Sequence, residues 1–302
     1  MLHRELISQA DLHTLDEQVD AALRPGADGG LGVLGVLSVL GYGEISLVLG
    51  WPPADPDVAC KRLPVFPDRS RYQAYASAIE DYIHVLRDLG VDVVETEVRS
   101  VDRHDGIAAY AVQPALAAEA LGVNVLAGAD PSVGHPMVGA VVDSVVAAVG
   151  PTVGLDSQLS NWAWVDQRLR YLDITTPIMW TDGRARVDVD LLTRSLPWVL
   201  RGGVKRFVVP GLLDRYRTLR LVLVDLCANL IKERLDPWMP VFIDAIGDTV
   251  EPRITEEECR KYYRSDARLW EVLLRVRRLD RAWQLRVRRR PYAFLLPKQI
   301  QR

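Results

Sequence analysis

The segment LGYGEISLV (residues 40–48) joins two expected strands and carries the first residues suited to phosphate chemistry. Gly41 and Gly43 have no side chain, so the backbone there can approach a phosphate closely with its amide N–H groups facing the anion. A hairpin turn also favours glycine. By itself the segment is therefore typical both of a phosphate-binding loop and of an ordinary turn.

Lys61 is the second residue of interest, because arginine is the usual cation of this chain. Only five of the 37 basic residues are lysines, and Lys61 stands in an apolar segment, residues 58–63, that we expect to be a strand. A buried lysine is costly unless it is paired. Glu80, beside the apolar face of a helix expected over residues 68–89, is the candidate partner. The alternative is an edge strand that the lysine protects from pairing.

Three further polar residues follow at short intervals. Asp156 and Asn161 stand five positions apart, and Asp173 follows twelve residues later at the end of an apolar segment. Each has a structural alternative, because Asp156 is suited to cap a helix and Asp173 to open a turn before Pro177. Taken singly, each of these residues has a structural explanation, and only their order and spacing indicate a shared function.

Taken in order, the features of residues 33–180 resemble the protein-kinase-like fold, especially its branch of aminoglycoside and choline phosphotransferases. In that family a glycine-rich loop covers the nucleotide phosphates, and a strand lysine paired to a helix glutamate holds the α- and β-phosphates. A D-x-x-x-x-N motif and a later aspartate supply the catalytic base and the magnesium ligands. The matching positions are Gly41, Gly43 and Ser46 in the loop, Lys61 with Glu80, Asp156 with Asn161, and Asp173.

The resemblance implies ATP and Mg²⁺ as cofactors. Asn161 and Asp173 would hold Mg²⁺, and Lys61 would neutralise phosphate charge. Asp156 would accept the proton of an acceptor hydroxyl as that hydroxyl attacks in line. The expected activity is transfer of the γ-phosphoryl group of ATP to a hydroxyl of a small molecule.

Several positions depart from the family pattern. Ser46 replaces the third loop glycine, Gly154-Leu155 replaces the His-Arg or His-Gly before the base, and Ile174-Thr175 replaces the Phe-Gly after the last aspartate. No A-P-E motif follows, which favours a small-molecule kinase over a regulated protein kinase. Two alternatives stay open: a pseudokinase or nucleotide-binding module that acts as a protein partner, and a divergent kinase of a peptide or protein serine.

The elements expected around these residues form an α+β, bilobal kinase-like architecture. Residues 1–30 form an N-terminal helical extension, residues 31–114 a small, mainly antiparallel β-rich lobe with one helix, and residues 115–302 a larger, mainly helical lobe. The segment 109–114, which includes Gln113, falls where the connection between such lobes would hydrogen-bond adenine through its backbone.

The composition is that of an ordinary globular protein, with 302 residues, a formal charge of −3, 49% hydrophobic and 25% charged residues. Residues 251–302 hold 15 basic against 7 acidic side chains, which indicates a solvated helix face or a docking site for a protein partner rather than for nucleic acid. Three widely separated cysteines favour a reducing cytoplasm and argue against a zinc site. No apolar run is long enough for a membrane span, which needs about 18 residues or more.

Overall fold

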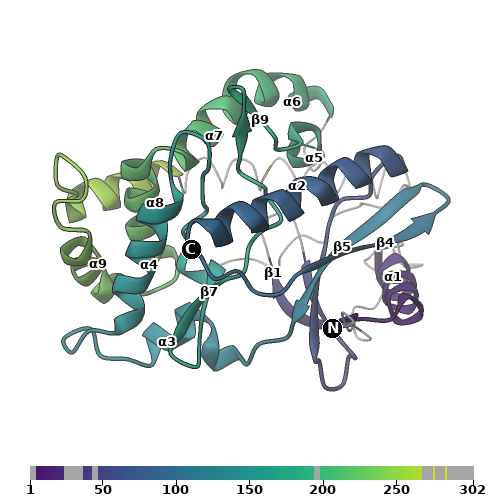
Figure 1. Cartoon of the computed structure of the whole chain (residues 1–302), viewed down its shortest axis with the longest axis horizontal. Coiled ribbons are helices and arrows are strands. Elements are labelled where there is room, and N and C mark those ends of the chain that lie inside the picture. Colours follow the sequence, from purple (N-terminus) through teal and green to yellow (C-terminus); the bar gives the residue numbers. More distant parts are fainter. Residues whose placement is uncertain are drawn as a thin grey trace.

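The computed structural model describes residues 5–23, 37–42, 47–193, 198–266, 275 and 283. It is a mixed α+β structure, in which an antiparallel sheet comes first along the chain and a mainly helical region follows (Figure 1). Two expected phosphate-loop positions, Gly43 and Ser46, lie outside the described residues, as do residues 267–274, 276–282 and 284–302 of the basic C-terminal segment. None of the described helices is long and apolar enough to cross a membrane.

Five antiparallel strands form the sheet, in the order β1-β2-β3-β5-β4. Lys61 lies on the central strand of this order and pairs with Val48 on one side and Ala111 on the other. The edge-strand alternative therefore does not hold for Lys61. The strands are β1 (Ser38–Tyr42), β2 (Leu47–Trp51), β3 (Val58–Arg62), β4 (Glu97–Arg103) and β5 (Gly106–Pro114).

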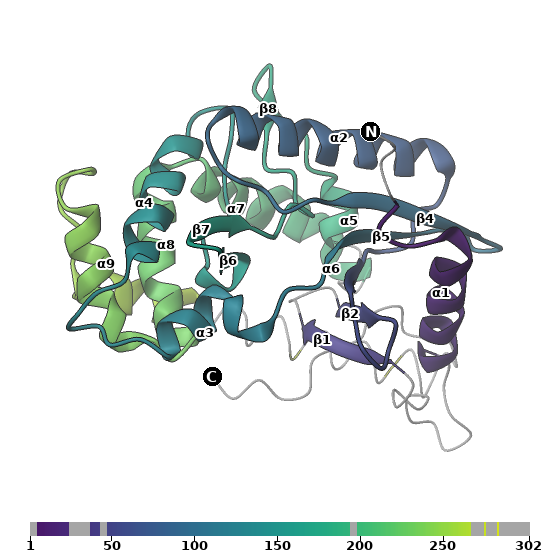
Figure 2. The same ribbon diagram turned by 60° about the horizontal axis from the view of Figure 1, so that its bottom comes forward.

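One helix covers each face of the sheet. Successive side chains of a strand point to opposite faces, and α1 (Gln9–Leu23) belongs to the same apolar cluster as Cys60 on one face. α2 (Arg69–Asp88) belongs to the cluster that holds Ala109 on the other face. In Figure 2, α2 lies above β4 and β5, and α1 lies below them. Lys61 follows Cys60 directly, so it belongs to the face that α2 covers.

α2 begins and ends where the sequence predicts. Asp68 is its N-cap and accepts a hydrogen bond from the backbone N–H of Arg71 at 2.9 Å. Gly90 follows the helix with a φ of 86°, a left-handed conformation that glycine adopts without strain. The buried residues recur at the helical period and are Tyr75, Ala78, Ile79, Tyr82, Ile83 and Leu86.

The helical region is built around α8 (Leu219–Lys232), which contributes eight buried residues. α4 (Pro136–Ala148) and α9 (Met239–Ile246) pack against α8 and against each other. The same apolar cluster includes the buried face of α2 and Ala109 of β5, so one continuous core joins the sheet to the helices.

The other described elements are shorter. They are η2 (Ala118–Ala120), α3 (Gly122–Ala127), η3 (Leu159–Asn161), β6 (Trp162–Val165), β7 (Arg168–Tyr171), β8 (Trp180–Thr181), β9 (Arg184–Ala185), α5 (Val189–Thr193), α6 (Trp198–Gly203), η4 (Val204–Val208), α7 (Val209–Tyr216) and η5 (Asp236–Trp238). The apolar segment before Asp173 forms β7, which ends two residues before that aspartate.

Candidate functional site

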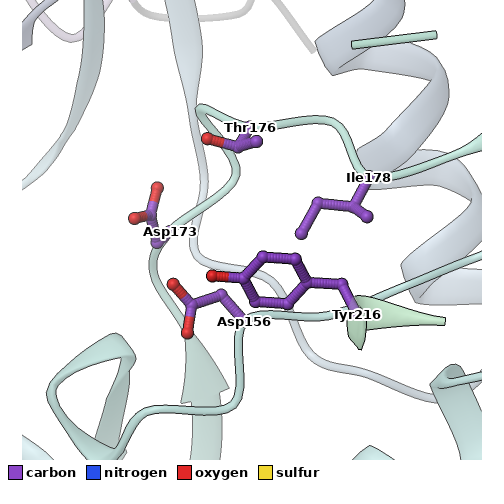
Figure 3. A pocket seen from close by; sticks show the side chains of 5 residues that line it. All are labelled: Asp156, Asp173, Thr176, Ile178 and Tyr216. Carbon is purple, nitrogen blue, oxygen red and sulfur yellow. The ribbon is translucent and has the colours of Figure 1, made fainter. Parts of the chain in front are cut away.

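A small pocket lies where the loop before η3 meets the chain that follows β7. Its cavity volume is about 40 Å³, and it is lined by Asp156, Asp173, Thr176, Ile178 and Tyr216. The carboxylate of Asp156 and the hydroxyl of Tyr216 lie side by side, and the side chain of Asp173 lies next to them (Figure 3). Two aspartates that the sequence analysis singled out therefore meet in one pocket.

The backbone around Asp156 is held in place by side-chain hydrogen bonds. Asn161 donates from Nδ2 to the carbonyl oxygen of Asp156 at 3.1 Å, and the hydroxyl of Tyr171 donates to the same oxygen at 3.1 Å. The backbone N–H of Leu172 donates to the carbonyl of Asn161 at 2.9 Å, which ties this loop to the residue before Asp173. Because Nδ2 of Asn161 is engaged, its Oδ1 is the atom that remains for a ligand.

Gly154, two residues before Asp156, stands where no side chain fits. A Cβ atom at this position would lie 2.5 Å from the carbonyl oxygen of Tyr216 and 2.7 Å from Cγ2 of Ile178. The backbone N–H of Gly154 donates to the carbonyl of Ile178 at 2.8 Å. This close approach excludes any side chain at position 154, because the space is filled by the backbone of Tyr216 and the side chain of Ile178.

Lys61 forms an ion pair with Asp173, and this pair joins the sheet to the pocket. Nζ of Lys61 lies 2.8 Å from Oδ1 of Asp173 across 112 residues of sequence, with the side chains 20% and 26% exposed. Thr175 donates to the same Oδ1 from its backbone N–H at 3.2 Å and from its hydroxyl at 2.7 Å. Three donors therefore converge on Oδ1, whereas no hydrogen bond from the described residues reaches Oδ2.

These contacts keep Asp173 ionised. Burial by itself would raise the pKa of its carboxyl group, but the Lys61 ammonium and the two hydrogen bonds from Thr175 outweigh burial and lower that pKa below its ordinary value. Asp173 is therefore a charged carboxylate at neutral pH.

The expected pairing of Lys61 with Glu80 is absent. Glu80 is exposed on the side of α2 that faces away from Ile79 and Ile83, and Lys61 pairs with Asp173 instead. The reason is the helical period: the residues that α2 buries against the sheet leave Glu80 on the solvent side.

Gln113 supports the site from the sheet. Its Nε2 donates to the carbonyl of Leu172 at 2.8 Å and to Oγ1 of Thr96 at 3.0 Å, which ties the residue before Asp173 to β5. The backbone of residues 109–112 is paired with β3 on one side and β4 on the other, so these residues do not form the connection between sheet and helices. That connection is residues 115–117, beyond the end of β5.

Gly41 lies in β1 opposite Val48, after an irregularity in the strand register. A Cβ atom there would lie 4.0 Å from Cβ of Val48, an ordinary contact, so packing does not require glycine at this position.

The C-terminal end of α8 anchors the loop of Asp156. Lys232 donates from Nζ to Oε1 of Gln158 at 2.9 Å, and Oε1 of Glu233 accepts the backbone N–H of Ser160 at 2.9 Å. Burial raises the pKa of Glu233, although its contacts with Ser160 oppose the shift. A rigid, mostly buried helix therefore positions the loop, and sequence reasoning missed both anchoring residues because their partners lie about 70 residues away.

Asp225, in the middle of α8, adds a third carboxyl group to this part of the molecule. Burial, followed by the negative charge of Asp156, raises the pKa of Asp225 to about 7, while a hydrogen bond with Tyr262 and the charge of Lys232 oppose the rise. At neutral pH the group is therefore close to half protonated, which limits the negative charge that accumulates beside Asp156.

The donor set of the pocket suits Mg²⁺ better than a transition metal. Oδ2 of Asp173, which lines the pocket, and Oδ1 of Asn161, which lies outside the pocket lining, are hard oxygen donors, and Mg²⁺ is usually bound by one or two carboxylates together with waters and substrate phosphates. No group of three or more His, Cys, Asp or Glu side chains gathers as a metal cage within the described part of the chain. The residues present thus fit a cation that arrives with its nucleotide.

The chain belongs to the DUF6206 family, a family of unknown function, whose model matches residues 18–281. None of the curated proteins matches it. Among solved structures, it is similar to the MAP kinase LmaMPK10 from Leishmania major, with 14% sequence identity over 85% of this chain and 89% of that chain and a TM-score of 0.28. Function therefore has to be argued from the chemistry of the site.

Proposed function

We propose that this protein is an ATP- and Mg²⁺-dependent phosphotransferase of bilobal, kinase-like fold that transfers the γ-phosphoryl group to a hydroxyl of a small molecule. The observation that carries the proposal is the ion pair of Lys61 with Asp173 at the mouth of a pocket that also holds Asp156. Folding brings together the Lys61 ammonium, which would neutralise phosphate charge, the Asp173 carboxylate, which would hold a metal, and the Asp156 carboxylate, which would act as a base, from three separate segments.

Each of these groups has a role that its contacts support. Asp173 would hold Mg²⁺ through Oδ2 and Asn161 through Oδ1, because the hydrogen bonds described above engage Oδ1 of Asp173 and Nδ2 of Asn161. The metal, when bound, supplies positive charge against the phosphate oxygens. Lys61 would add a second positive charge against the same phosphate oxygens. Its backbone is held in place because it lies on an interior strand of the sheet.

Asp156 would act as the base. As the acceptor oxygen forms its bond to phosphorus and the bond from phosphorus to the ADP oxygen breaks, the hydroxyl proton passes to the Asp156 carboxylate. The carbonyl of Asp156 is held by Asn161 and Tyr171, so the side chain is positioned before the acceptor arrives. Tyr216 and Ile178, the pocket residues nearest to Gly154, would contact the acceptor beside its reacting hydroxyl.

A pseudokinase or nucleotide-binding module is the second candidate, and one contact favours it. In the structure Lys61 binds Asp173 directly, so a nucleotide has to insert its phosphates and metal where these two side chains already satisfy each other. On this alternative the basic C-terminal segment docks a protein partner. A kinase of a peptide or protein serine would differ from the first proposal only in its acceptor. A cytoplasmic location, where ATP is available, belongs to the same proposal.

The experiment is a thermal-shift titration with Mg·ATP, together with an ATPase assay, on the wild type, Lys61→Ala, Asp173→Ala and Asp156→Asn. We expect the wild type to gain melting temperature with Mg·ATP, Lys61→Ala and Asp173→Ala to lose that gain, and Asp156→Asn to keep binding but lose turnover. Binding without turnover in the wild type across a panel of hydroxyl acceptors supports the pseudokinase. Absence of any Mg·ATP-dependent shift in the wild type rules out both candidates.

A further inference from the structure

Two tyrosines of α2 reach the backbone beside both pocket aspartates. Tyr75 and Tyr82 are seven residues apart, which is two helical turns, so they share the face that α2 buries. Both are almost fully buried, at 9% and 0% exposure. A buried hydroxyl needs a partner, and each of these finds one outside its own helix.

Tyr75 acts on the chain that follows Asp173. Its hydroxyl donates to the carbonyl oxygen of Thr175 at 2.5 Å, across 100 residues of sequence. Thr175 in turn donates twice to Oδ1 of Asp173. One hydroxyl of α2 thereby fixes the residue that orients the metal-binding carboxylate and leaves Oδ2 for a cation.

Tyr82 acts on the loop that precedes Asp156. Its hydroxyl donates to the carbonyl oxygen of Gly154 at 2.8 Å, in a fully buried contact. Gly154 is locked on its other side by the carbonyl of Tyr216 and by the hydrogen bond to Ile178. The backbone two residues before Asp156 therefore has no freedom to shift unless this hydroxyl is removed.

Both tyrosines remain hydrogen-bond donors at any pH the protein meets. Burial is the largest cause that raises the pKa of each phenol, and the negative charge of Asp173 raises both further, as does that of Asp156 for Tyr82. Neither hydroxyl ionises, so neither competes with the carboxylates for protons.

We propose that Tyr75 and Tyr82 are positioning residues, which couple helix α2 to the metal-binding and base-carrying aspartates of the phosphotransfer site. This inference rests on the proposed function. The position of α2 then sets the separation of Asp156 and Asp173 through two hydroxyl-to-carbonyl bonds. A helix that moved along the sheet would shift both aspartates together.

The experiment compares Tyr75→Phe and Tyr82→Phe with a matched control, Tyr72→Phe. Tyr72 lies on the same helix and donates its hydroxyl to the carbonyl of Val98 at 3.1 Å, away from the pocket. Each variant loses one hydroxyl-to-carbonyl bond and keeps its ring, so differences between them report on position rather than on the loss of a bond. The measurements are Mn²⁺ affinity in the presence of a non-hydrolysable ATP analogue, by electron paramagnetic resonance, and the kcat and KM of ATP hydrolysis, all well below the lowest melting temperature.

We expect Tyr75→Phe to weaken Mn²⁺ binding by about 10-fold or more, with unchanged affinity for the metal-free nucleotide, because it acts on the Asp173 carboxylate. Tyr82→Phe should lower kcat by about 10- to 100-fold with little change in KM or in Mn²⁺ affinity, because it acts on Asp156. Tyr72→Phe should match the wild type in both measurements. In an Asp173→Ala background, Tyr75→Phe should have no further effect on Mn²⁺ binding.

Equal values for all three variants, in a wild type that binds and hydrolyses Mg·ATP, would overturn the positioning role and leave the proposed function intact. A further loss of Mn²⁺ affinity from Tyr75→Phe in the Asp173→Ala background would also overturn it, because Tyr75 would then act by another route. A wild type that binds neither Mn²⁺ nor nucleotide would overturn the proposed function and this inference together.

Discussion

Lys61 and Asp173 are the two residues whose contact does most to define the site. Their side chains are 20% and 26% exposed, so water screens the attraction only in part, and the pair falls between a surface and a buried ion pair. The hydrogen bonds from Thr175 reduce the penalty of bringing the carboxylate out of water. The contact therefore stabilises the fold and keeps the carboxylate ionised.

Asp173→Asn should lower the free energy of unfolding by about 1–2 kcal/mol at pH 7, because it leaves the Lys61 ammonium without its partner. The double variant Asp173→Asn/Lys61→Met should recover part of that loss, because the unpaired charge is then removed. The folded-state pKa of Asp173 is below the unfolded value, so this stabilisation is present above about pH 4 and disappears as the pH falls through the folded pKa. Urea unfolding at pH 7 and pH 3 measures it, and a deficit that is no smaller at pH 3 would contradict the ion pair.

Gly154 offers a second test at the same scale. Gly154→Ala should destabilise the protein by about 1–3 kcal/mol and displace Tyr216, since the new Cβ meets backbone rather than a flexible side chain. Gly139→Ala is the matched control, because Gly139 lies in α4 with nothing within 4 Å of a Cβ, and alanine there should be neutral or stabilising by up to about 1 kcal/mol. Similar melting temperatures of the two variants would show that the backbone of Tyr216 leaves room for a side chain at position 154.

At the level of elements, α2 and α8 position the pocket from two sides. α2 does so through two tyrosine hydroxyls, and α8 through the contacts of Lys232 and Glu233 with the loop of Asp156. Both helices bury an apolar face in the same core, so neither can move without disturbing packing. Precise placement of the aspartates thus follows from rigid helices rather than from the loops that carry them.

Asp225 on α8 leads to a pH-dependent prediction. Its folded-state pKa of about 7 is above the unfolded value of about 3.9, so the folded protein binds more protons between these values and its stability falls as the pH rises through this range. The Asp225→Asn variant has no carboxyl group at this position, so it does not lose stability in this way as the pH rises. The melting temperature of Asp225→Asn relative to the wild type should therefore be higher at pH 8 than at pH 4.5, and a difference that does not change with pH would contradict the raised pKa.

At the scale of the whole molecule, the sheet and the helical region share one apolar core. The buried face of α2 and Ala109 of β5 belong to the same cluster as the buried residues of α4, α8 and α9. Lys61–Asp173 and Gln113–Leu172 add polar contacts across the same boundary. The two regions therefore should not behave as independent folding units.

We expect a single cooperative unfolding transition. Far-ultraviolet circular dichroism, tryptophan fluorescence and calorimetry should report one melting temperature, with the calorimetric enthalpy equal to the van't Hoff enthalpy. The fluorescence of Trp51 in β2 and of Trp238 in the helical region should change together, as single-tryptophan variants can show. Two separate transitions would mean that the shared core does not couple the regions.

Local patterns in the sequence were sufficient to predict the α+β composition, a strand that carries Lys61 and the bounds of α2, whereas only the strand pairing showed that this strand is an interior one. Asp68 and Gly90 determine those bounds through side-chain capping and a left-handed backbone, which are properties of single residues and their neighbours. The spacing of Asp156, Asn161 and Asp173 predicted a common site; in the structure Asp156 and Asp173 line one pocket, and Asn161 contacts the backbone carbonyl of Asp156, whereas the function of that site stays a prediction.

Only the tertiary structure decided which groups these residues contact. The rotation of α2 about its axis places Glu80 in solvent and two tyrosines against the aspartate loops, and that rotation depends on packing against the sheet. Lys61 consequently pairs with a residue 112 positions away, and Tyr216 enters the pocket because Gly154 leaves room for its backbone. The sequence alone determined which chemical groups are present and in what order, because these follow from residue type and local spacing; the partners of each group depend on long-range packing, which local patterns do not encode.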